Sequence, residues 1–226
     1  MTKAWRPSDV PSEQADDAGD HVGAVGLSVC VFCASADGLP MAYHDAARRL
    51  GRELAGRGQR LVYGGGDVGL MGEVARAVHD HGGRIFGAIP RSLVERELAY
   101  GPADELLVTE TLRERKAAMD ERADAFVALP GGFGTLEELV EVITLRQLGL
   151  HHRPIVVVDV AGYYQPFADL AARMVAQGFA PAGQGSLFEV AASPDQAIEL
   201  VEAGVRAGGS DGAAPLQAAV ESWEDG

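Results

Sequence analysis

The chain has 226 residues, of which 47% are hydrophobic, so it is long enough for one globular domain with a sizeable core. Its formal net charge of −14 disfavours a general binder of nucleic acids or anionic membranes, because both surfaces repel an acidic protein. No apolar run approaches the ~20 residues that cross a bilayer, and the first residues lack the hydrophobic region of a secretory signal. We therefore expect a cytoplasmic protein that binds neither nucleic acid nor membrane.

Along the chain, residues 1–26 are rich in Asp, Ser, Gly and Pro and predict a disordered acidic tail. Short β-branched runs then alternate with longer helical patterns. The expected strands are 27–33, 60–63, 84–89, 105–108, 124–129, 154–158 and 187–190, and the expected helices are 39–57, 69–81, 91–99, 111–122, 135–149, 162–177 and 194–205. This alternation predicts one α/β domain over residues 27–206, with a doubly wound, Rossmann-like parallel sheet and helices on both faces. Residues 207–226 predict a second, flexible acidic tail.

Cysteine and lysine are both rare. Cys30 and Cys33 form a CxxC motif inside a predicted strand, where side chains three positions apart face opposite sides of the sheet. We therefore expect two separate buried thiols rather than a redox pair. The chain has 17 Arg and two Lys, and only Lys116 of the two lies within the predicted domain.

A first glycine turn, Gly64-Gly65-Gly66-Asp67-Val68-Gly69, follows a predicted strand and opens a helix, and it formally satisfies GxGxxG. Glycine lets the backbone approach a phosphate, and the amino end of a helix offers free N–H groups. A dinucleotide site also needs an acidic residue at the end of the next strand. That strand is followed by Pro90-Arg91, which disfavours NAD. Tight packing of the helix on the sheet is the alternative explanation of these glycines.

A second glycine turn, Pro130 to Glu138 (PGGFGTLEE), again places glycines and a threonine at a helix amino end. It lacks the G-K-[ST] ending of an ATPase loop. Thr135 and Glu138 also match a capping box, in which the glutamate only closes the start of the helix. Both turns are therefore candidates for the floor of a phosphate site.

The helix after this turn carries two apolar stripes. We expect the first stripe, Leu136, Leu139, Val140 and Ile143, to pack on the sheet. The second stripe, Glu138, Val142, Leu145 and Gly149, then needs another covering surface, for which a homodimer partner is the simple candidate. Desolvation at that edge is expected to raise the pKa of Glu138, which favours a catalytic role over a cap alone.

The helix from Thr111 is rich in cations and begins with a capping box of Thr111 and Glu114. Its expected inward face carries Leu112, Met119 and Ala123. Arg115 and Lys116 flank that face and need a carboxylate or a ligand phosphate as partner, unless they extend into solvent at a solvated edge. Six His near helix ends or loops are interpreted as surface residues, and no Ser-His-Asp order or metal-ligand spacing is present. The pattern indicates a pocket for a small phosphorylated molecule, and a carboxylate there suits cleavage of a glycosidic bond.

The segment Leu112–Met119 and the PGGFGTLEE segment resemble the Lonely guy (LOG) family of cytokinin riboside 5′-monophosphate phosphoribohydrolases, some members of which carry the label lysine decarboxylase. The resemblance covers about residues 27–205. It implies hydrolysis of the N-glycosidic bond of cytokinin riboside 5′-monophosphates or AMP-like nucleotides, releasing free base and ribose 5-phosphate. It also implies no metal or other cofactor, and a homodimer with sites near the subunit interface.

The resemblance assigns roles to individual residues. Arg115 and Glu138 match the family's catalytic pair. The matches to substrate-binding positions are Glu97, Arg115, Lys116, Gly131, Gly132, Gly134, Thr135 and Glu137, with Thr144 a weaker match seven residues after Glu137. The sequence departs from the family pattern at Ala34 and Ala36, where Gly and Ser are usual, and at Leu145, where Trp is frequent.

Two other functions remain open from the sequence. One is a non-catalytic nucleotide or molybdenum cofactor carrier protein of the same fold. The other is a lysine decarboxylase that uses pyridoxal phosphate, for which Lys116 is the only plausible Schiff-base residue.

Overall fold

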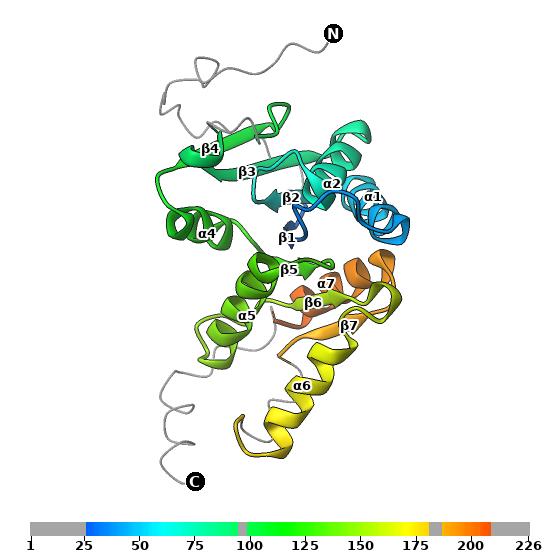
Figure 1. The fold of residues 1–226 in the computed structure, drawn as a ribbon, viewed down its shortest axis with the longest axis vertical. Coiled ribbons are helices and arrows are strands. Elements are labelled where there is room, and N and C mark those ends of the chain that lie inside the picture. The colour runs from blue at the N-terminus through cyan, green and yellow to red at the C-terminus, as the bar shows by residue number, and fades with distance from the viewer. Residues whose placement is uncertain (1–25, 95–98, 181–186, 209–226) are drawn as a thin grey trace.

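The computed structural model describes residues 26–94, 99–180 and 187–208, and it contains all seven predicted strands in one parallel sheet (Figure 1). The strands are β1 Ser28–Phe32, β2 Arg60–Tyr63, β3 Arg84–Pro90, β4 Glu105–Thr109, β5 Ala125–Ala128, β6 Ile155–Val158 and β7 Glu189–Ala191. Their order across the sheet is β4-β3-β2-β1-β5-β6-β7, and every neighbouring pair is parallel. The doubly wound α/β prediction is confirmed.

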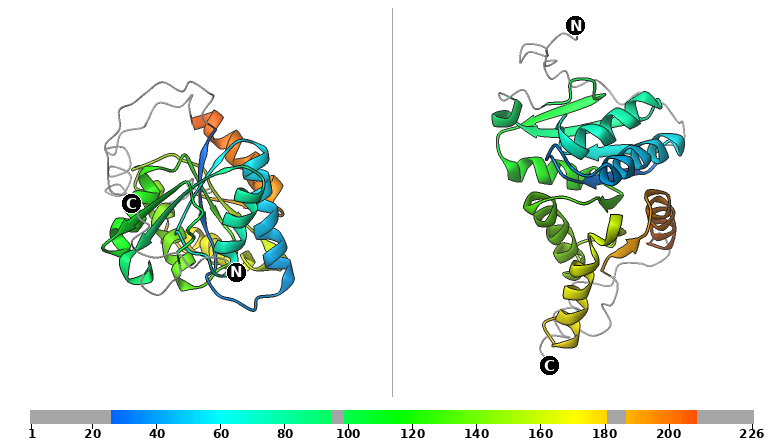
Figure 2. Two further views of the ribbon diagram at one scale, coloured as in Figure 1. Left: turned by 90° about the horizontal axis from the view of Figure 1, so that it is seen from above. Right: turned by 45° about the vertical axis from the view of Figure 1, so that its right-hand side comes forward.

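Helices cover both faces of the sheet, as the two views of Figure 2 show. One face carries α1 Met41–Gly56, α2 Gly69–Asp80 and α7 Pro194–Gly208. The other face carries α4 Leu112–Glu121, α5 Phe133–Gln147 and the start of α6 Gln165–Ala176. Two short elements complete the fold: α3 Arg91–Val94 and the 3₁₀ turn η2 Val160–Gly162. Each helix in the described part of the chain is too short or too polar to span a lipid bilayer.

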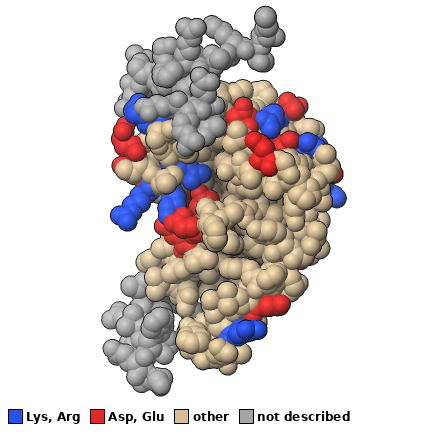
Figure 3. All heavy atoms as spheres, viewed as in Figure 1, with Lys and Arg blue, Asp and Glu red and all other residues tan. Residues whose placement is uncertain are grey.

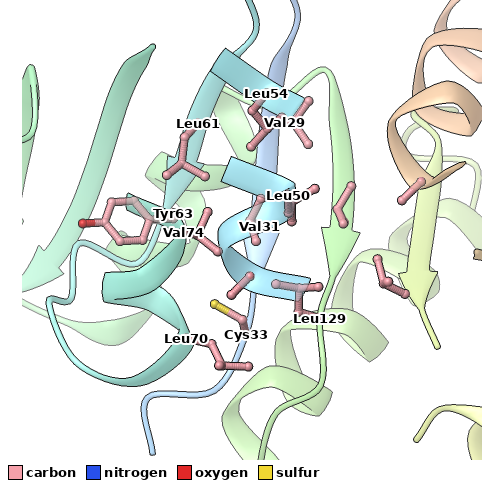
Figure 4. Close-up of a cluster of buried hydrophobic side chains, with 14 of the residues drawn as sticks. Val29, Val31, Cys33, Leu50, Leu54, Leu61, Tyr63, Leu70, Val74 and Leu129 are labelled. Atoms are coloured by element: carbon pink, nitrogen blue, oxygen red, sulfur yellow. The ribbon is translucent and has the colours of Figure 1, made fainter. Parts of the chain in front are cut away.

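The core is divided by the sheet into two clusters. Figure 4 shows one of them, in which Val29, Val31 and Cys33 of the β1 region pack against leucines of α1 and α2. Cys30 points to the other cluster, where it packs with Phe126 of β5. Both thiols are free and buried, and burial raises the pKa of each. The prediction of two separate thiols on opposite faces is confirmed.

Several helix ends differ from the prediction. The helix expected over 91–99 is described only over Arg91–Val94, because residues 95–98 lie outside the described residues. Ala99, the last residue of that expected helix, pairs with Gly66 in an isolated antiparallel bridge. Helix α7 continues to Gly208, two residues beyond the expected end of the domain. The tails predicted for 1–26 and 207–226 lie almost wholly outside the described residues.

The faces of α5 agree only in part with the prediction. The buried residues of α5 are Thr135, Glu138, Leu139 and Val142, whereas Val140 of the expected inner stripe is 46% exposed. Leu139 of that expected stripe is nevertheless buried, and Leu136 and Ile143 pack against the core cluster. Of the second stripe, Glu138 and Val142 are buried and line a cavity together with Leu145. Residues of both stripes of α5 therefore pack inside the chain, and not those of one stripe alone. Beside α4, Met119 and Ala123 are buried as expected, whereas the third expected inward residue, Leu112, is 59% exposed.

Candidate active site

The strand order reverses between β1 and β5, because the chain first builds outward to β4 and then returns beside β1. At such a switch point the loops that follow the two strands separate and leave a crevice at their carboxyl ends. A cavity of about 690 Å³ lies there, lined by the loops after β1, β2 and β5 and by the end of β3. The fold therefore places a ligand-sized space where its topology predicts one.

The loop from β5 into α5 supplies free backbone donors to this cavity. Gly132 is the N-cap of α5 and no side chain caps the helix, so the first N–H groups of α5 have no partner within it. A Cβ on Gly132 or Gly134 would meet open space, whereas a Cβ on Gly131 would lie 2.1 Å from Thr135 Oγ1. Thr135 lies inside the first turn and is buried, so the capping-box alternative for Thr135 and Glu138 is wrong.

Arg115 and Glu138 form an ion pair at the base of the cavity. Arg115 Nη1 donates to Glu138 Oε1 at 2.6 Å, and Arg115 Nε donates to Ala88 O at 3.2 Å. The two side chains are only 13% and 11% exposed. Helix α4 thus presents the guanidinium and α5 the carboxylate, and both residues line the cavity. The partner that the sequence required for Arg115 is a carboxylate.

The environment of Glu138 changes its proton affinity. Burial raises the pKa of the Glu138 carboxyl above its usual 4.5, and the charge of Arg115 offsets only part of that rise. A carboxylate with a raised pKa accepts a proton more readily than an exposed one. Glu138 is therefore equipped to take a proton from water held in the cavity.

The glycines of the first turn are explained by contacts within the protein. A Cβ on Gly64 would lie 1.7 Å from Arg115 Nη2, so glycine at this position makes room for the guanidinium. Gly69 has a φ of +58° and lies against the backbone of the loop after β1. The Gly69 N–H already donates to Asp37 Oδ1 at 3.2 Å. The expectation that this turn holds a phosphate in the same way as the second turn is therefore not supported, although Gly64 and Gly66 line the cavity.

Lys116 points to a second cavity of about 550 Å³ between α4 and α5. Its Nζ donates to Glu137 Oε1, and to Glu141 Oε2 at 2.8 Å. Burial lowers the pKa of Lys116, but the two carboxylates raise it by more than burial lowers it. The pKa of Lys116 is therefore above its usual value. Glu138 lines both cavities, and Leu145 lines the second one. Figure 3 shows the resulting mixture of basic and acidic side chains over α4 and α5.

Most of the residues singled out from the sequence come together around Glu138, with two exceptions. Thr144 lies on the outward face of α5, donates its hydroxyl to Val140 O at 2.7 Å and lines a separate groove. The structure does not bring it to the cavity. Glu97 lies outside the described residues.

Sequence reasoning missed two residues near the cavity, Asp37 and Tyr163. Asp37 lines the cavity, and Tyr163 donates its hydroxyl to Gly131 O. The sequence did hold a signal for Tyr163, because this residue closely follows the carboxyl end of the predicted strand 154–158, where ligands of such a fold bind. Among the histidines, His151 is half-buried, contrary to the surface interpretation, and burial lowers its pKa to about 4. Within the described residues, no three His, Cys, Asp or Glu side chains are grouped to hold a metal ion.

Comparison with known proteins gives the family. A protein-family profile described as "Possible lysine decarboxylase" matches residues 71–201. The chain is 52% identical over 151 residues to the cytokinin riboside 5′-monophosphate phosphoribohydrolase LOG of Oryza sativa subsp. japonica, covering 67% of this chain and 62% of that protein. It is 45% identical over 199 residues to the probable phosphoribohydrolase LOGL9 of the same plant, covering 86% of this chain and 88% of LOGL9. The chain belongs to the LOG family.

The similarity to solved structures concerns the fold. The molybdenum cofactor binding protein of Rippkaea orientalis matches with a TM-score of 0.62 and 21% identity, over 80% of this chain and 98% of that one. The molybdenum cofactor carrier protein of Chlamydomonas reinhardtii matches with a TM-score of 0.61 and 21% identity, over 80% of this chain and 99% of that one. These proteins and this LOG-family chain share an architecture.

Proposed function

We propose that this protein hydrolyses the N-glycosidic bond of cytokinin riboside 5′-monophosphates or AMP-like nucleotides, releasing free base and ribose 5-phosphate. The observation that carries the proposal is the buried Arg115–Glu138 pair beside the free amino end of α5. The 45% identity to LOGL9 over most of both chains supports the same activity. Apart from Thr144, the proposed substrate-binding residues are those that the family resemblance matched.

The roles follow from the geometry. The N–H groups at the start of α5, together with Thr135, bind the phosphate, since a helix amino end attracts anions. As the bond between C1′ and the base nitrogen breaks, its electron pair leaves with the base and positive charge develops on the ribose. The Glu138 carboxylate stabilises that charge and takes a proton from the water whose hydroxide adds to C1′. Glu138 then gives up this proton and the leaving base gains it, so the carboxylate is restored. Arg115 orients Glu138 through the 2.6 Å hydrogen bond.

Chromatographic detection of the base released from AMP and isopentenyl-AMP tests the proposal. Glu138→Gln keeps the shape of the side chain but removes its negative charge, so we expect the rate to fall at least about 100-fold, the lower range for loss of a general base. Glu199→Gln is the matched control, because Glu199 lies on α7 across the sheet and its side chain is 66% exposed. Normal base release by Glu138→Gln would contradict the catalytic assignment.

We also propose a homodimer, formed through the outward faces of α5 and α6. A groove of about 540 Å³ between these helices is lined mainly by apolar side chains, among them Val140, Ile143, Leu170, Met174, Phe188 and Val190. Val140, Leu170 and Met174 are each more than 40% exposed in the single chain. Apolar surface of this kind, gathered in one place, is typical of a protein contact. A second copy can cover the groove, and Thr144 then lies at the interface.

The oligomeric state can be measured by sedimentation of the wild type and two variants. Leu170→Glu places a charge in the groove and is expected to give a monomer. Met41→Glu, at a 62% exposed position on α1 across the sheet, is expected to leave the dimer intact. A monomeric wild type, or a dimeric Leu170→Glu variant, would contradict the proposed interface. The cytoplasmic location rests on the sequence alone and stays a prediction.

The two alternative functions have less support. Similarity to the cofactor carrier proteins reaches only 21% identity and extends to the fold alone. A Schiff-base lysine must lose its proton to react, and its pKa is typically lowered by burial or by a nearby cation. Lys116 instead binds Glu137 and Glu141, which raise its pKa. The family profile's description as a lysine decarboxylase therefore does not match the environment of the only lysine in the described residues.

A further inference from the structure

Two consecutive tyrosines hold the loop that carries the free N–H groups. Tyr163 donates its hydroxyl to Gly131 O, and Tyr164 donates its hydroxyl to Leu129 O at 2.9 Å. Both tyrosines come from the segment between β6 and α6, more than thirty positions further along the chain. The loop from β5 into α5 is thus fixed from outside by two side chains of the same kind.

The two hydrogen bonds have different consequences for the backbone. In a trans peptide the carbonyl and the N–H point in opposite directions. Because Tyr163 holds the Gly131 carbonyl, the N–H of Gly132 points away from Tyr163, and Gly132 lines the cavity. Tyr164 holds the peptide between Leu129 and Pro130, and proline has no N–H to present. Only the bond from Tyr163 therefore orients a donor.

The Gly131–Gly132 peptide needs such an anchor. Glycine adopts backbone conformations of either sign at little cost, so a peptide between two glycines can rotate more easily than most. A Cβ on Gly132 would meet open space, which means that packing does not restrain this residue. If the peptide rotated, its carbonyl oxygen would face the cavity and repel an anion.

The segment that carries the tyrosines is itself held in an unusual conformation. Ala161 has a φ of +54° and Gly162 a φ of +77°. The left-handed conformation is unfavourable for alanine, so this turn persists only because its surroundings impose it. Asp159 Oδ1 accepts from Tyr164 N at 2.7 Å, and the ring of Tyr163 packs edge-on against Tyr164 with centroids 5.2 Å apart.

We propose that Tyr163 is a positioning residue for the phosphate site: its hydroxyl holds the Gly131–Gly132 peptide so that the Gly132 N–H faces a phosphate oxygen. This inference rests on the proposed function, because it takes the phosphate to bind at the start of α5. Tyr164 stabilises the same loop without orienting a donor, and it therefore serves as the matched control.

The test uses the full chain as wild type, Tyr163→Phe and Tyr164→Phe. Binding of ribose 5-phosphate is measured by calorimetry, and unfolding temperatures show that each variant is folded. We expect Tyr163→Phe to bind about tenfold more weakly, which corresponds to about 1.4 kcal/mol. Tyr164→Phe should bind within about twofold of wild type while losing more thermal stability, because it loses a buried hydrogen bond to Leu129 O. In turnover of AMP, Tyr163→Phe should raise KM and leave kcat nearly unchanged.

Equal weakening by both variants would overturn the inference, because the effect would then be structural. Unchanged binding in Tyr163→Phe, or a wild type that does not bind ribose 5-phosphate, would also overturn it. Failure of the proposed function is a separate result. If the wild type binds ribose 5-phosphate but releases no base from any nucleotide, the proposed hydrolase activity is refuted. The comparison of binding by Tyr163→Phe and Tyr164→Phe then still tests the role of Tyr163.

Discussion

Replacing Arg115 by methionine should make the stability of the protein depend strongly on pH. The substitution keeps an unbranched side chain in α4 but leaves the carboxylate of Glu138, whose side chain is 11% exposed, without its cation. Removing one partner of a buried ion pair costs about 3–5 kcal/mol when the remaining charge stays buried. The carboxyl can escape part of this cost by taking up a proton.

The cost of that proton sets the pH dependence. Protonating a carboxyl costs about 1.4 kcal/mol for each pH unit above its ordinary pKa. With an ordinary value of 4.5, the cost for Glu138 is below about 1 kcal/mol at about pH 5 and several kcal/mol at about pH 8. A carboxyl whose pKa is raised in the folded state favours folding at low pH and loses that contribution as the pH rises through the folded-state pKa. Arg115→Met should therefore lose about 1–2 kcal/mol at about pH 5 and about 3–5 kcal/mol at about pH 8.

Urea unfolding at the two pH values measures these losses. Lys116→Met is the control, because Lys116 is adjacent in sequence and binds the more exposed Glu137 and Glu141 (59% and 44% exposed). Exposed pairs contribute about 0–1 kcal/mol, so its loss should be small at both pH values. Arg115→Met combined with Glu138→Gln should remove the pH dependence. A loss for Arg115→Met that is equal at both pH values, or no larger than the control's, would refute the reasoning.

Two further predictions concern activity. In a pH–rate profile, base release should decline on the acid side with an apparent pKa above 4.5. The reason is that the pKa of Glu138 is raised and its carboxylate is the reactive form. A decline centred below pH 4.5 would contradict this expectation. Gly64→Ala should displace the Arg115 guanidinium, whose Nη2 lies 1.7 Å from the new Cβ. It should therefore lower base release about tenfold or more and also lower the unfolding temperature, because it disturbs the buried pair with Glu138. Gly132→Ala is the stability control in the same thermal scan, because its new Cβ meets open space. If Gly132→Ala lowered the unfolding temperature more than Gly64→Ala, the described packing around these two glycines would be wrong.

Much of the fold could be predicted from local patterns. The β-branched runs located all seven strands to within about two residues, since a strand buried on both faces is apolar throughout. The start of α5 was missed by two residues, because Gly132 and Gly134 lower the helix signal where the helix begins. The inner face of α5 was predicted at Leu139, whereas burial of Glu138 was not separable from periodicity, because its partner Arg115 lies 23 positions away.

The candidate site was predictable where its residues lie next to a motif. Arg115, Glu138 and Thr135 were found because glycine turns and helix starts mark them in the sequence. Asp37 and Tyr163 were missed, because their contacts with Gly69 and Gly131 join segments about thirty residues apart. No periodicity reports a contact between a side chain and a distant loop.

The scarcity of lysine gives this chain a built-in chemical reporter. An acylating reagent meets only two lysine side chains in 226 residues, Lys3 and Lys116. Acylation requires the neutral amine, and the carboxylates of Glu137 and Glu141 keep Lys116 protonated, so it should react more slowly than an unpaired lysine. A ligand that draws either carboxylate away, or covers the second cavity, changes that rate. The mass of one peptide would then follow occupancy of the site without any introduced label.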